Sequence, residues 1–407
     1  MDNYPRLLVL ASTFPRWVGD TEPAFVFALC KHLSQHYQVH VLAPHAPGAA
    51  VLETMDGITV HRFRYAPERM QTLSYQGGII SRLRQNRWRA LLIPLFLLTE
   101  ARAVRRLLRQ YDFQAIHSHW IVPQTLALRL GTLGMRHVPP VLCTSHGGDL
   151  FGLQGRSAVA LKRWALARCD AITVVSRAMV PPARALAPRL EPGVIPMGTD
   201  LTERFVPDPD STRAPNQLLF VGRLVEKKGV LQLLEALARL VPKHPALRLT
   251  IAGMGPLQTQ LEERAARADL QGHVEFLGGV PHDQLPQLFR RTTAAIVPSV
   301  VAEGGDQEGF GLVIVEAMGC ACPVVVSDLP AIRDIVGEQD IARRVPPGDI
   351  DALANAIDHL LTDPEATQAR AQRALAQVRS RFDWASISEA YRQTLESIGQ
   401  AKRSGKA

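Results

Sequence analysis

The chain has 407 residues, enough for two domains of ordinary size. Its composition, with 46% hydrophobic and 21% charged residues, is typical of a globular protein and excludes a disordered or repetitive chain. The net charge of +8 is uneven, because residues 1–200 hold 23 Lys and Arg against 12 Asp and Glu, whereas the remainder holds 23 against 26. We therefore expect an acidic partner for the first half: anionic lipid, a phosphorylated acceptor or, less favoured, nucleic acid.

Cysteine usage indicates a reducing compartment, and the apolar runs give no sign of a membrane span. The five cysteines form no C-x-x-C pair, which argues against a disulfide framework. The first residues predict a strand rather than a signal peptide, and the apolar run Leu91–Leu98 is too short to span a bilayer. We expect a cytoplasmic protein.

The chain opens with the pattern of a Rossmann-like unit. Arg6–Ala11 predicts a buried strand, residues 12–23 form a loop containing Gly19, and residues 24–36 have helical spacing. A second strand is expected at Gln38–Ala43. This order of strand, glycine-containing loop and helix is typical of a nucleotide-binding fold.

The segment Ile79–Arg109 is unusually basic around its apolar run. Trp88 and Phe96 accompany the charges, a pattern that suits an amphipathic segment on an anionic membrane surface. The alternative is a surface helix packed on its own sheet with solvated arginines. The basic residues are Arg82, Arg84, Arg87, Arg89, Arg102, Arg105, Arg106 and Arg109.

Histidines end two expected strands of the first half. His117 and His119 alternate along Gln114–His119 and so share one side of the strand. A metal site would need a third ligand, and the sequence makes none evident. His146 follows the strand that begins at Val141, at the carboxyl end where ligands of open α/β sheets bind.

The second half starts a new strand–loop–helix unit at Gln217–Val221. In the following loop, Gly222 to Gly229, Arg223 and Lys228 are suited to clamp a polyphosphate. Lys227 is expected to be a solvated neighbour. The alternative, a helix N-terminus that is basic without binding a ligand, is disfavoured because cations are unfavourable at that position unless an anion is present.

Two further strands and a short insertion follow. Leu247–Gly255 ends in a Gly-x-Gly turn, which alone is weak support for a nucleotide site, and Val274–Val280 is another strand. The acidic insertion at residues 302–306 is interpreted either as a lid or as an acceptor contact.

The stretch Gln307–Val326 predicts a loop, a helix starting near Leu312 and a strand. Gly309 and Gly311 allow the backbone to approach a ligand closely. The free N–H groups of the helix start suit phosphate or sugar hydroxyls.

Two glutamates lie in this stretch. Glu308 and Glu316 would be about 12 Å apart along a helix, which fits two contacts on one long ligand better than a glycosidase pair. Glu316 falls among apolar residues and needs a partner. Pairing with an arginine is the alternative to a ligand contact.

The segment EGFGLVIVEAMGCACPVV, beginning at Glu308, resembles the E-x7-E motif of family 4 retaining glycosyltransferases. Gly222-Arg-Leu, followed by Lys228-Gly229, is similar to a second motif of that family. The resemblance implies the GT-B fold, an α/β architecture of two Rossmann-like doubly wound domains facing across a cleft. The resemblance covers nearly the whole chain, with two departures. Many family members have a Gly-Gly pair in the first loop, where this chain has only Gly19. In the segment that resembles the family's Pro-Asn-Gly-Val-Asp, Met197 replaces the asparagine.

The resemblance also implies roles for individual residues. Glu308 and His146 would contact the donor sugar, Glu316 the ribose, and Arg223 and Lys228 the diphosphate. Catalytic roles are expected for His146, Arg223, Lys228 and Glu308. Donor contacts are expected for Gly19, Gly222, Gly253, Gly255, Val280, Gly309, Phe310, Gly311, Leu312 and Glu316. The acceptor side is expected to hold His117, His119 and Asp149.

The expected domains are residues 1–200, which would take the acceptor, and residues 201–381, which would take the nucleotide sugar. A final helix at 382–398 is expected to return to the first domain. We expect no metal and no cofactor beyond the nucleotide-sugar co-substrate, an expectation that assumes the chain to lack the Asp-x-Asp tripeptide with which other transferases bind a metal and the diphosphate.

The expected function is transfer of a hexose, with retention, from a UDP- or GDP-sugar to a lipid-linked oligosaccharide or surface polysaccharide. We expect the enzyme to be peripheral on the inner face of the cell membrane, through residues 79–109, with no nucleic-acid partner. The alternatives are a GT-B sugar-nucleotide epimerase or phosphorylase, or a non-catalytic polyanion-binding module.

Overall fold

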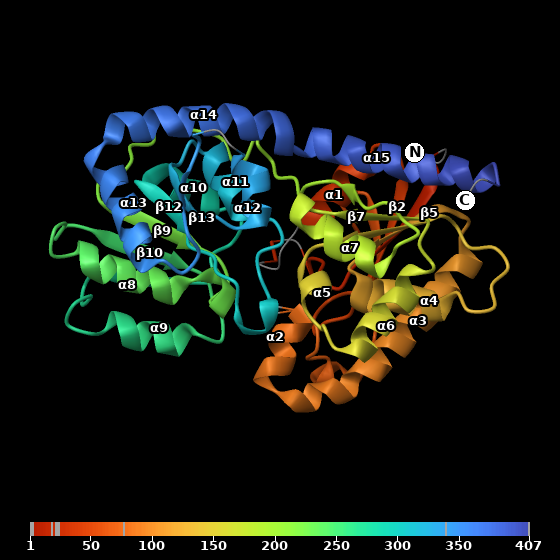
Figure 1. The fold of residues 1–407 in the computed structure, drawn as a ribbon. Coiled ribbons are helices and arrows are strands. Elements are labelled where there is room, and N and C mark those ends of the chain that lie inside the picture. The colour runs from red at the N-terminus through yellow and green to blue at the C-terminus, as the bar shows by residue number, and fades with distance from the viewer. Residues whose placement is uncertain (1–3, 18, 21–24, 76–77, 338–339, 406–407) are drawn as a thin grey trace. The chain divides into compact units, whose positions relative to one another are not determined.

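The structure is a computed structural model that describes residues 4–17, 19–20, 25–75, 78–337 and 340–405. The chain forms two compact units (Figure 1). Residues 1–196 together with 384–407 make the first unit, and residues 197–383 make the second. Residues 18 and 21–24 of the expected first loop and helix lie outside the described residues, as does the side chain of Arg84.

The first unit is built on an eight-stranded sheet of order β3-β4-β2-β1-β5-β6-β7-β8, parallel except for the β3–β4 pair. The strands are β1 (Arg6–Leu10), β2 (Gln38–Pro44), β3 (Leu52–Met55), β4 (Ile58–Phe63), β5 (Phe113–His119), β6 (Val141–Ser145), β7 (Ala171–Val174) and β8 (Gly193–Val194). The order reverses between β1 and β5, so this unit has its topological switch point there.

Helices cover both faces of this sheet. They are α1 (Phe25–Leu33), α2 (Gly78–Gln85), α3 (Ile93–Gln110), α4 (Leu126–Gly131), α5 (Gly148–Phe151), α6 (Arg156–Leu166), α7 (Val180–Leu186) and α15 (Trp384–Arg403). One core cluster joins the sheet to α1 and α15, and another joins the opposite face to α3. The central strand β1 is apolar on both faces because both faces are buried.

Helix α15 packs on the first unit, next to α1 (Figure 1). Its buried face contributes Trp384, Tyr391 and Leu395 to the same core as β1. The chain enters and leaves the second unit at neighbouring points, because Thr199 N donates to Phe382 O at 3.0 Å.

The second unit has a six-stranded, fully parallel sheet of order β11-β10-β9-β12-β13-β14. Its strands are β9 (Gln217–Val221), β10 (Arg248–Ala252), β11 (Val274–Gly278), β12 (Ala294–Val297), β13 (Val324–Ser327) and β14 (Arg343–Val345). Its helices are α8 (Val230–Leu240), α9 (Gln258–Ala265), α10 (Leu285–Arg291), α11 (Leu312–Gly319), α12 (Pro330–Val336), α13 (Ile350–Thr362) and α14 (Pro364–Phe382). The switch point lies between β9 and β12.

The structure confirms two parallel α/β domains, and α11 begins at Leu312, where the sequence predicts it. The antiparallel β3–β4 hairpin was missed. Its turn is Asp56-Gly57, with both residues at positive φ (46° and 81°). This dipeptide is a strong hairpin signal that sequence reasoning could have used.

Candidate active site

Two loops meet at the switch point of the second unit. One runs from Gly222 to Gly229 after β9, and the other from Pro298 to Gly311 after β12. Parallel strands present their carboxyl ends at one edge, so residues far apart in sequence converge there. Lys228 Nζ forms an ion pair with Glu308 Oε2, and these side chains are 15% and 13% exposed.

The charges around Glu308 keep it ionised. Burial alone would raise its pKa, but the positive charges of Lys228, Lys227 and Arg223 outweigh burial and lower the pKa of Glu308 to about 2. Glu308 is therefore a carboxylate at neutral pH and cannot serve as a general acid. Three cations, Arg223, Lys227 and Lys228, therefore act on Glu308 at this edge of the sheet.

The expectation that Lys227 is solvated is wrong. The residue is 9% exposed. Lys227 Nζ lies 2.9 Å from Asp306 Oδ1 and donates to Gln307 O at 3.3 Å. A buried ammonium requires such a partner, and the partner lies 79 residues away in sequence. Sequence spacing gave no sign of this pairing.

The same pairing anchors the acidic insertion, residues 302–306. The backbone N–H of Glu303 donates to Glu226 Oε1 at 2.8 Å, and Val300 N donates to Lys227 O at 2.9 Å. The loop after β12 is thus fastened to the loop after β9 on both sides of Lys227.

Glycines allow these loops to pack against each other. A Cβ atom on Gly229 would lie 1.8 Å from Pro298 O. A Cβ on Gly253, in the turn after β10, would lie 1.8 Å from Gly222 O. A Cβ on Gly255 would lie 2.3 Å from Leu224 O. Gly253 and Gly255 therefore have a backbone-packing reason, in addition to the donor contact that the sequence assigns to them.

The start of α11 is set by Gly311, which has φ +98°. Phe310 is 2% exposed and packs edge-on against Phe382, with ring centroids 5.6 Å apart. The Phe310 side chain is packed into the interior of the unit, so any contact of Phe310 with a donor would come from its backbone. Gly309 is also buried, and the first N–H groups of α11 at Leu312 lack partners within the helix.

Glu316 lies on the second turn of α11 and is 4% exposed. Its Oε1 lies 2.8 Å from His282 Nε2. The partner is thus a histidine, not the arginine considered from the sequence. Sequence reasoning missed His282, although it lies only two residues beyond Val280, in the turn after β11.

In the first unit, three imidazoles meet at the carboxyl ends of β5 and β6. The rings of His117 and His119 are 4.1 Å apart, and His119 Nδ1 lies 2.9 Å from His146 Nε2. His117 Nε2 lies 2.8 Å from Thr144 Oγ1. No group of three such residues has metal-binding geometry in the part of the chain that the structure describes.

These histidines are neutral near pH 7. Burial lowers the pKa of His146 to about 3. Burial, together with repulsion from a protonated His146, also lowers the pKa of His117 to about 3. Burial also lowers the pKa of His119 well below its usual value. The His146 ring packs against Phe25, at 4.9 Å between centroids, and its Nδ1 has no hydrogen-bond partner among the described residues.

Asp149 has a structural position next to this group. Its Oδ2 accepts from Ile121 N at 2.7 Å, and its Oδ1 accepts from Ser145 Oγ at 2.8 Å and from His146 N at 3.2 Å. Burial raises the pKa of Asp149, and these hydrogen bonds oppose that rise. The carboxyl group fixes the turns after β5 and β6 and so orients His146.

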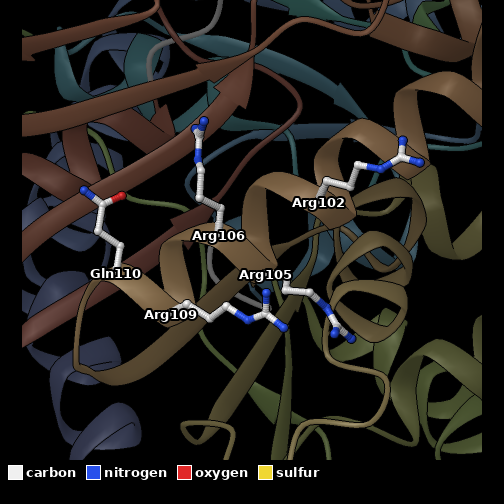
Figure 2. A pocket seen from close by; sticks show the side chains of 5 residues that line it. All are labelled: Arg102, Arg105, Arg106, Arg109 and Gln110. Carbon is white, nitrogen blue, oxygen red and sulfur yellow. The ribbon is translucent and has the colours of Figure 1, made fainter.

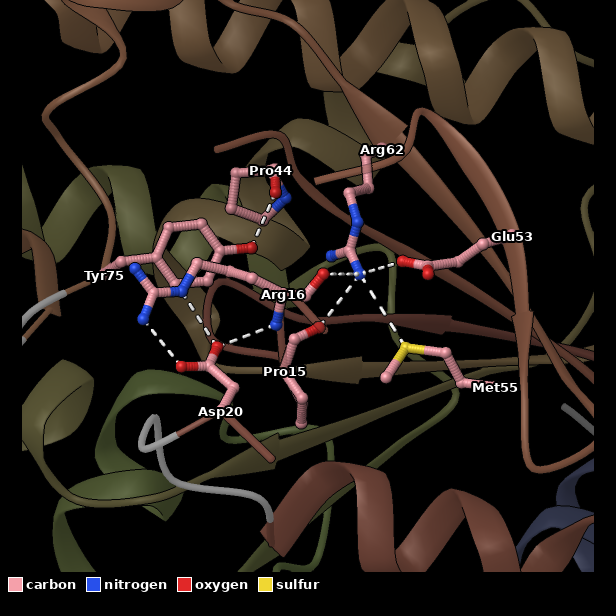
Figure 3. A network of polar contacts seen from close by, with 8 residues as sticks. All are labelled: Pro15, Arg16, Asp20, Pro44, Glu53, Met55, Arg62 and Tyr75. Atoms are coloured by element: carbon pink, nitrogen blue, oxygen red, sulfur yellow. Dashed lines mark hydrogen bonds and ion pairs between the residues drawn. The ribbon is translucent and has the colours of Figure 1, made fainter. Parts of the chain in front are cut away.

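The loop after β1 is held by a buried arginine from the β3–β4 hairpin (Figure 3). Arg62 is 2% exposed, and its Nη2 donates to Pro15 O at 2.9 Å and pairs with Glu53 Oε1 at 2.6 Å. Within the loop, Arg16 and Asp20 form a two-pronged ion pair. The hairpin that the sequence analysis missed is therefore what positions this loop.

Gly19 lies inside the loop, one residue before Asp20, with φ +80°. A Cβ there would meet no atom of the described residues within 4 Å. Its glycine is thus explained by backbone conformation rather than by close packing.

Two Asp-x-Asp tripeptides do occur in the chain, at 208–210 and 349–351. Asp349 caps α13 by accepting from Ala352 N at 2.9 Å, and Asp351 pairs with Arg239 on α8. Residues 208–210 lie in an exposed turn before β9. Neither tripeptide lies beside Lys228 and Glu308 in the described contacts.

The basic segment of the first unit forms α2, a short 3-10 helix over Arg87–Leu92, and α3. Four arginines on α3 line a shallow pocket of about 480 Å³ (Figure 2). They are Arg102, Arg105, Arg106 and Arg109, with Gln110 beside them. None of the helices that the structure describes combines the length and hydropathy needed to cross a bilayer.

Two family models divide the chain between them. The model "Glycosyltransferase Family 4" matches residues 24–203, and "Glycosyl transferases group 1" matches residues 203–377. Similar curated proteins include a glycogen synthase of Mycobacterium tuberculosis, which is 30% identical over an alignment that covers 72% of this chain and 71% of the synthase. Another is a GDP-mannose-dependent alpha-(1-6)-phosphatidylinositol monomannoside mannosyltransferase of Mycolicibacterium smegmatis. It is 30% identical over an alignment that covers 67% of this chain and 73% of the mannosyltransferase.

Solved structures share the fold. Sucrose-phosphate synthase from Thermosynechococcus elongatus has a TM-score of 0.78 at 21% identity, covering 98% of this chain and 100% of its own. Anabaena HepE in complex with UDP and glucose has a TM-score of 0.72 at 21% identity, covering 97% and 100%. With the sequence relatives, these matches show that the chain belongs to the family 4 glycosyltransferases and has the GT-B fold.

Proposed function

We propose that this glycosyltransferase moves a hexose, with retention of configuration, from a nucleoside diphosphate sugar to a lipid-linked or polysaccharide acceptor. The observation that carries the proposal is the Lys228–Glu308 pair with Arg223 nearby, at the switch point of the second unit. This arrangement offers cations to a diphosphate and a fixed carboxylate to the sugar attached to it. A UDP- or GDP-linked donor fits, since one related structure holds UDP and one relative is named for GDP-mannose.

In the proposed reaction, Arg223, Lys228 and the N–H groups at the start of α11 stabilise the charge that develops on the leaving diphosphate. These groups take the place that a metal ion holds in other transferases. The bond between the anomeric carbon and the phosphate oxygen breaks, and the acceptor oxygen attacks on the same face. The acceptor proton passes to the leaving phosphate oxygen.

The states of the titratable groups fit this front-face route. Glu308 has its negative charge held by Lys228, which makes it a poor covalent nucleophile. On the first unit, the Nδ1 of neutral His146 has no partner among the described residues and can exchange a hydrogen bond with a sugar hydroxyl. Each feature is suited to orienting a sugar rather than to forming a covalent bond with it.

The test is a thermal-shift panel with UDP, GDP, ADP and NAD on the wild type, Arg223→Ala and Arg239→Ala. A ligand that binds only the folded state raises the melting temperature. We expect one nucleoside diphosphate to stabilise the wild type and Arg239→Ala, whose arginine pairs with Asp351 on the outer surface, but not Arg223→Ala. If none of these ligands stabilises the wild type, a polyanion-binding module becomes the better interpretation.

We further propose that the acceptor is reached at an anionic membrane surface through the 3-10 helix at Arg87–Leu92 and α3. Trp88 and Leu91 are 79% and 69% exposed, and Leu95 and Leu98 continue the same exposed stripe at helical spacing. Apolar side chains followed by arginines are typical of an interfacial helix.

The charge of this surface is not offset. Arg102, Arg106 and Arg109 pair with no acidic side chain among the described residues. The acidic residue of α3, Glu100, is fully buried, and burial raises its pKa to about 8. It is therefore largely neutral near pH 7.

Vesicle sedimentation tests the membrane proposal. We expect binding to anionic vesicles to weaken by roughly 100-fold when Arg102, Arg106 and Arg109 are all changed to Gln, since each basic residue contributes about 1 kcal/mol. Arg105 is left in place because its Nε donates to Gly131 O at 2.9 Å. An unchanged partition, or equal binding to neutral vesicles, would remove the proposal.

A further inference from the structure

Glu316 is held by a chain of polar contacts that begins outside α11. A carboxylate that is 4% exposed needs a hydrogen-bond donor, and His282 Nε2, 2.8 Å from Glu316 Oε1, is in place to supply it. His282 itself is 40% exposed. Its ring stands edge-on to Phe205, with centroids 5.2 Å apart, which limits the orientation of the imidazole.

The contact made by the other ring nitrogen of His282 shows which of the two nitrogens carries the proton. Arg204 Nη1 lies 3.3 Å from His282 Nδ1. A guanidinium can only donate, so Nδ1 must accept and carry no proton. The proton of neutral His282 is therefore on Nε2, and the imidazole donates it to Glu316.

Arg204 and Phe205 are themselves fixed against α11. A Cβ on Gly319, the last residue of α11, would lie 2.5 Å from Leu201 Cδ2 and 2.7 Å from Phe205 O. Arg204 O also accepts from Arg290 Nη2 at 3.0 Å. The segment from Leu201 to Phe205 is thus packed closely on the end of the helix that carries Glu316.

We propose that His282 is a positioning residue of the donor site, and that Arg204 selects its Nε2–H tautomer so that the Glu316 carboxylate is held ready for the ribose hydroxyls. The inference rests on the proposed function and on the ribose contact that the family resemblance implies for Glu316. A carboxylate has about four acceptor positions, so a single bond from His282 leaves capacity for two hydroxyls. Replacing His282 should therefore disturb ribose recognition before it disturbs binding of the diphosphate.

The test compares the affinity for a ribonucleoside diphosphate with that for its 2′,3′-dideoxy analogue, using UDP or GDP, whichever binds the wild type. Loss of hydrogen bonds to a charged group should give a preference for the ribonucleotide of about tenfold or more. We expect His282→Leu to abolish this preference. His244→Leu is the matched control, since His244 Nε2 lies 2.6 Å from Asp358 Oδ1 elsewhere on the same unit.

A pair of conservative variants decides the matter even where His282→Leu fails to fold. The amide nitrogen of a glutamine reaches about as far as Nε2, whereas that of an asparagine reaches only as far as Nδ1. We expect His282→Gln to keep the ribose preference and His282→Asn to lose it. Retention of the preference in both His282→Leu and His282→Asn would overturn the inference.

The role of Arg204 has a readout that does not depend on activity. Nitrogen chemical shifts of His282 in the whole protein should show the Nε2–H tautomer in the wild type and a mixture in Arg204→Leu. An Nδ1–H tautomer in the wild type would overturn the assignment.

Failure of this inference is distinguishable from failure of the proposed function. A wild type that binds no nucleoside diphosphate refutes both. A wild type that binds one in an Arg223-dependent way, without any ribose preference, refutes only the role given to Glu316 and His282.

Discussion

Polar side chains gather at the carboxyl ends of the strands in both parallel sheets, yet the two groups differ in charge. The edge beside β9 and β12 holds ion pairs, with Lys227, Lys228 and Arg223 around an ionised Glu308. The edge beside β5 and β6 holds imidazoles that burial keeps neutral.

Under the proposed function, this difference would suit one architecture to two tasks. A leaving diphosphate needs fixed positive charge, whereas a sugar or acceptor hydroxyl needs only hydrogen bonds. The positive excess of residues 1–200 does not collect at the neutral edge but is prominent along α3, on another part of that unit. Charge therefore follows the chemistry of each surface rather than the average of its domain.

The largest expected effect is on turnover at the charged edge. Lys228→Met should lower kcat/KM by about 100- to 1,000-fold, because it removes a cation that acts on the developing phosphate charge. Lys243→Met, in which a surface lysine that pairs with Asp358 is lost, should stay near wild type. Initial rates with the donor identified by the thermal-shift panel provide the measurement, and a small loss for Lys228→Met would weaken the contrast between the two edges.

The second effect is a pH dependence of stability at Glu308. Its pKa is depressed from 4.5 to about 2, so the ionised form stabilises the folded state by about 3 kcal/mol above pH 4.5. That contribution is lost as the pH falls through about 2. Urea unfolding of wild type and Glu308→Gln should show a difference near pH 6 that shrinks between pH 4.5 and pH 2; a constant difference contradicts the electrostatic account.

The neutral edge should show a pH dependence in a different window. The folded pKa of His117 is about 3, below its usual 6.5, so the unfolded chain binds its proton first as the pH falls. Stability should therefore fall from pH 6.5 downward, by about 2 kcal/mol for this histidine at pH 5. His117→Gln should remove that part of the slope, whereas His36→Gln, at an exposed position, should not.

The smallest effect concerns the anchored insertion. A double-mutant cycle with Lys227→Met and Asp306→Asn should give a coupling of about 1 kcal/mol in unfolding free energy, since the pair is partly exposed. Turnover should fall further than stability implies, because Lys227 also holds the backbone at Gln307, next to Glu308. Strict additivity of the two substitutions would show that the insertion is not fastened there.

Sequence reasoning went furthest where chemistry lies in short motifs. The order of strands and helices predicted Rossmann-like units, and the family resemblance predicted the GT-B fold, which is confirmed. Arg223, Lys228 and Glu308 became site candidates because each follows an apolar strand in a glycine-containing loop, and their roles remain predictions. The structure adds the pairing of Lys228 with Glu308, whose partners are 80 residues apart. Sequence reasoning missed the partners of Glu316 and Lys227, because only the sheet order and close helix packing bring these residues together. His282 contacts Glu316, Arg204 contacts His282, and Asp306 pairs with Lys227.

The most direct test of the central claim is calorimetry of a nucleoside, its monophosphate and its diphosphate on the wild type and Arg223→Ala. If the cations of the second unit bind the diphosphate, wild-type affinity should rise steeply with each phosphate, and this gain should largely disappear in Arg223→Ala while the weak nucleoside affinity stays. An equal affinity for nucleoside and diphosphate in the wild type, or the same gain in both proteins, would contradict the account.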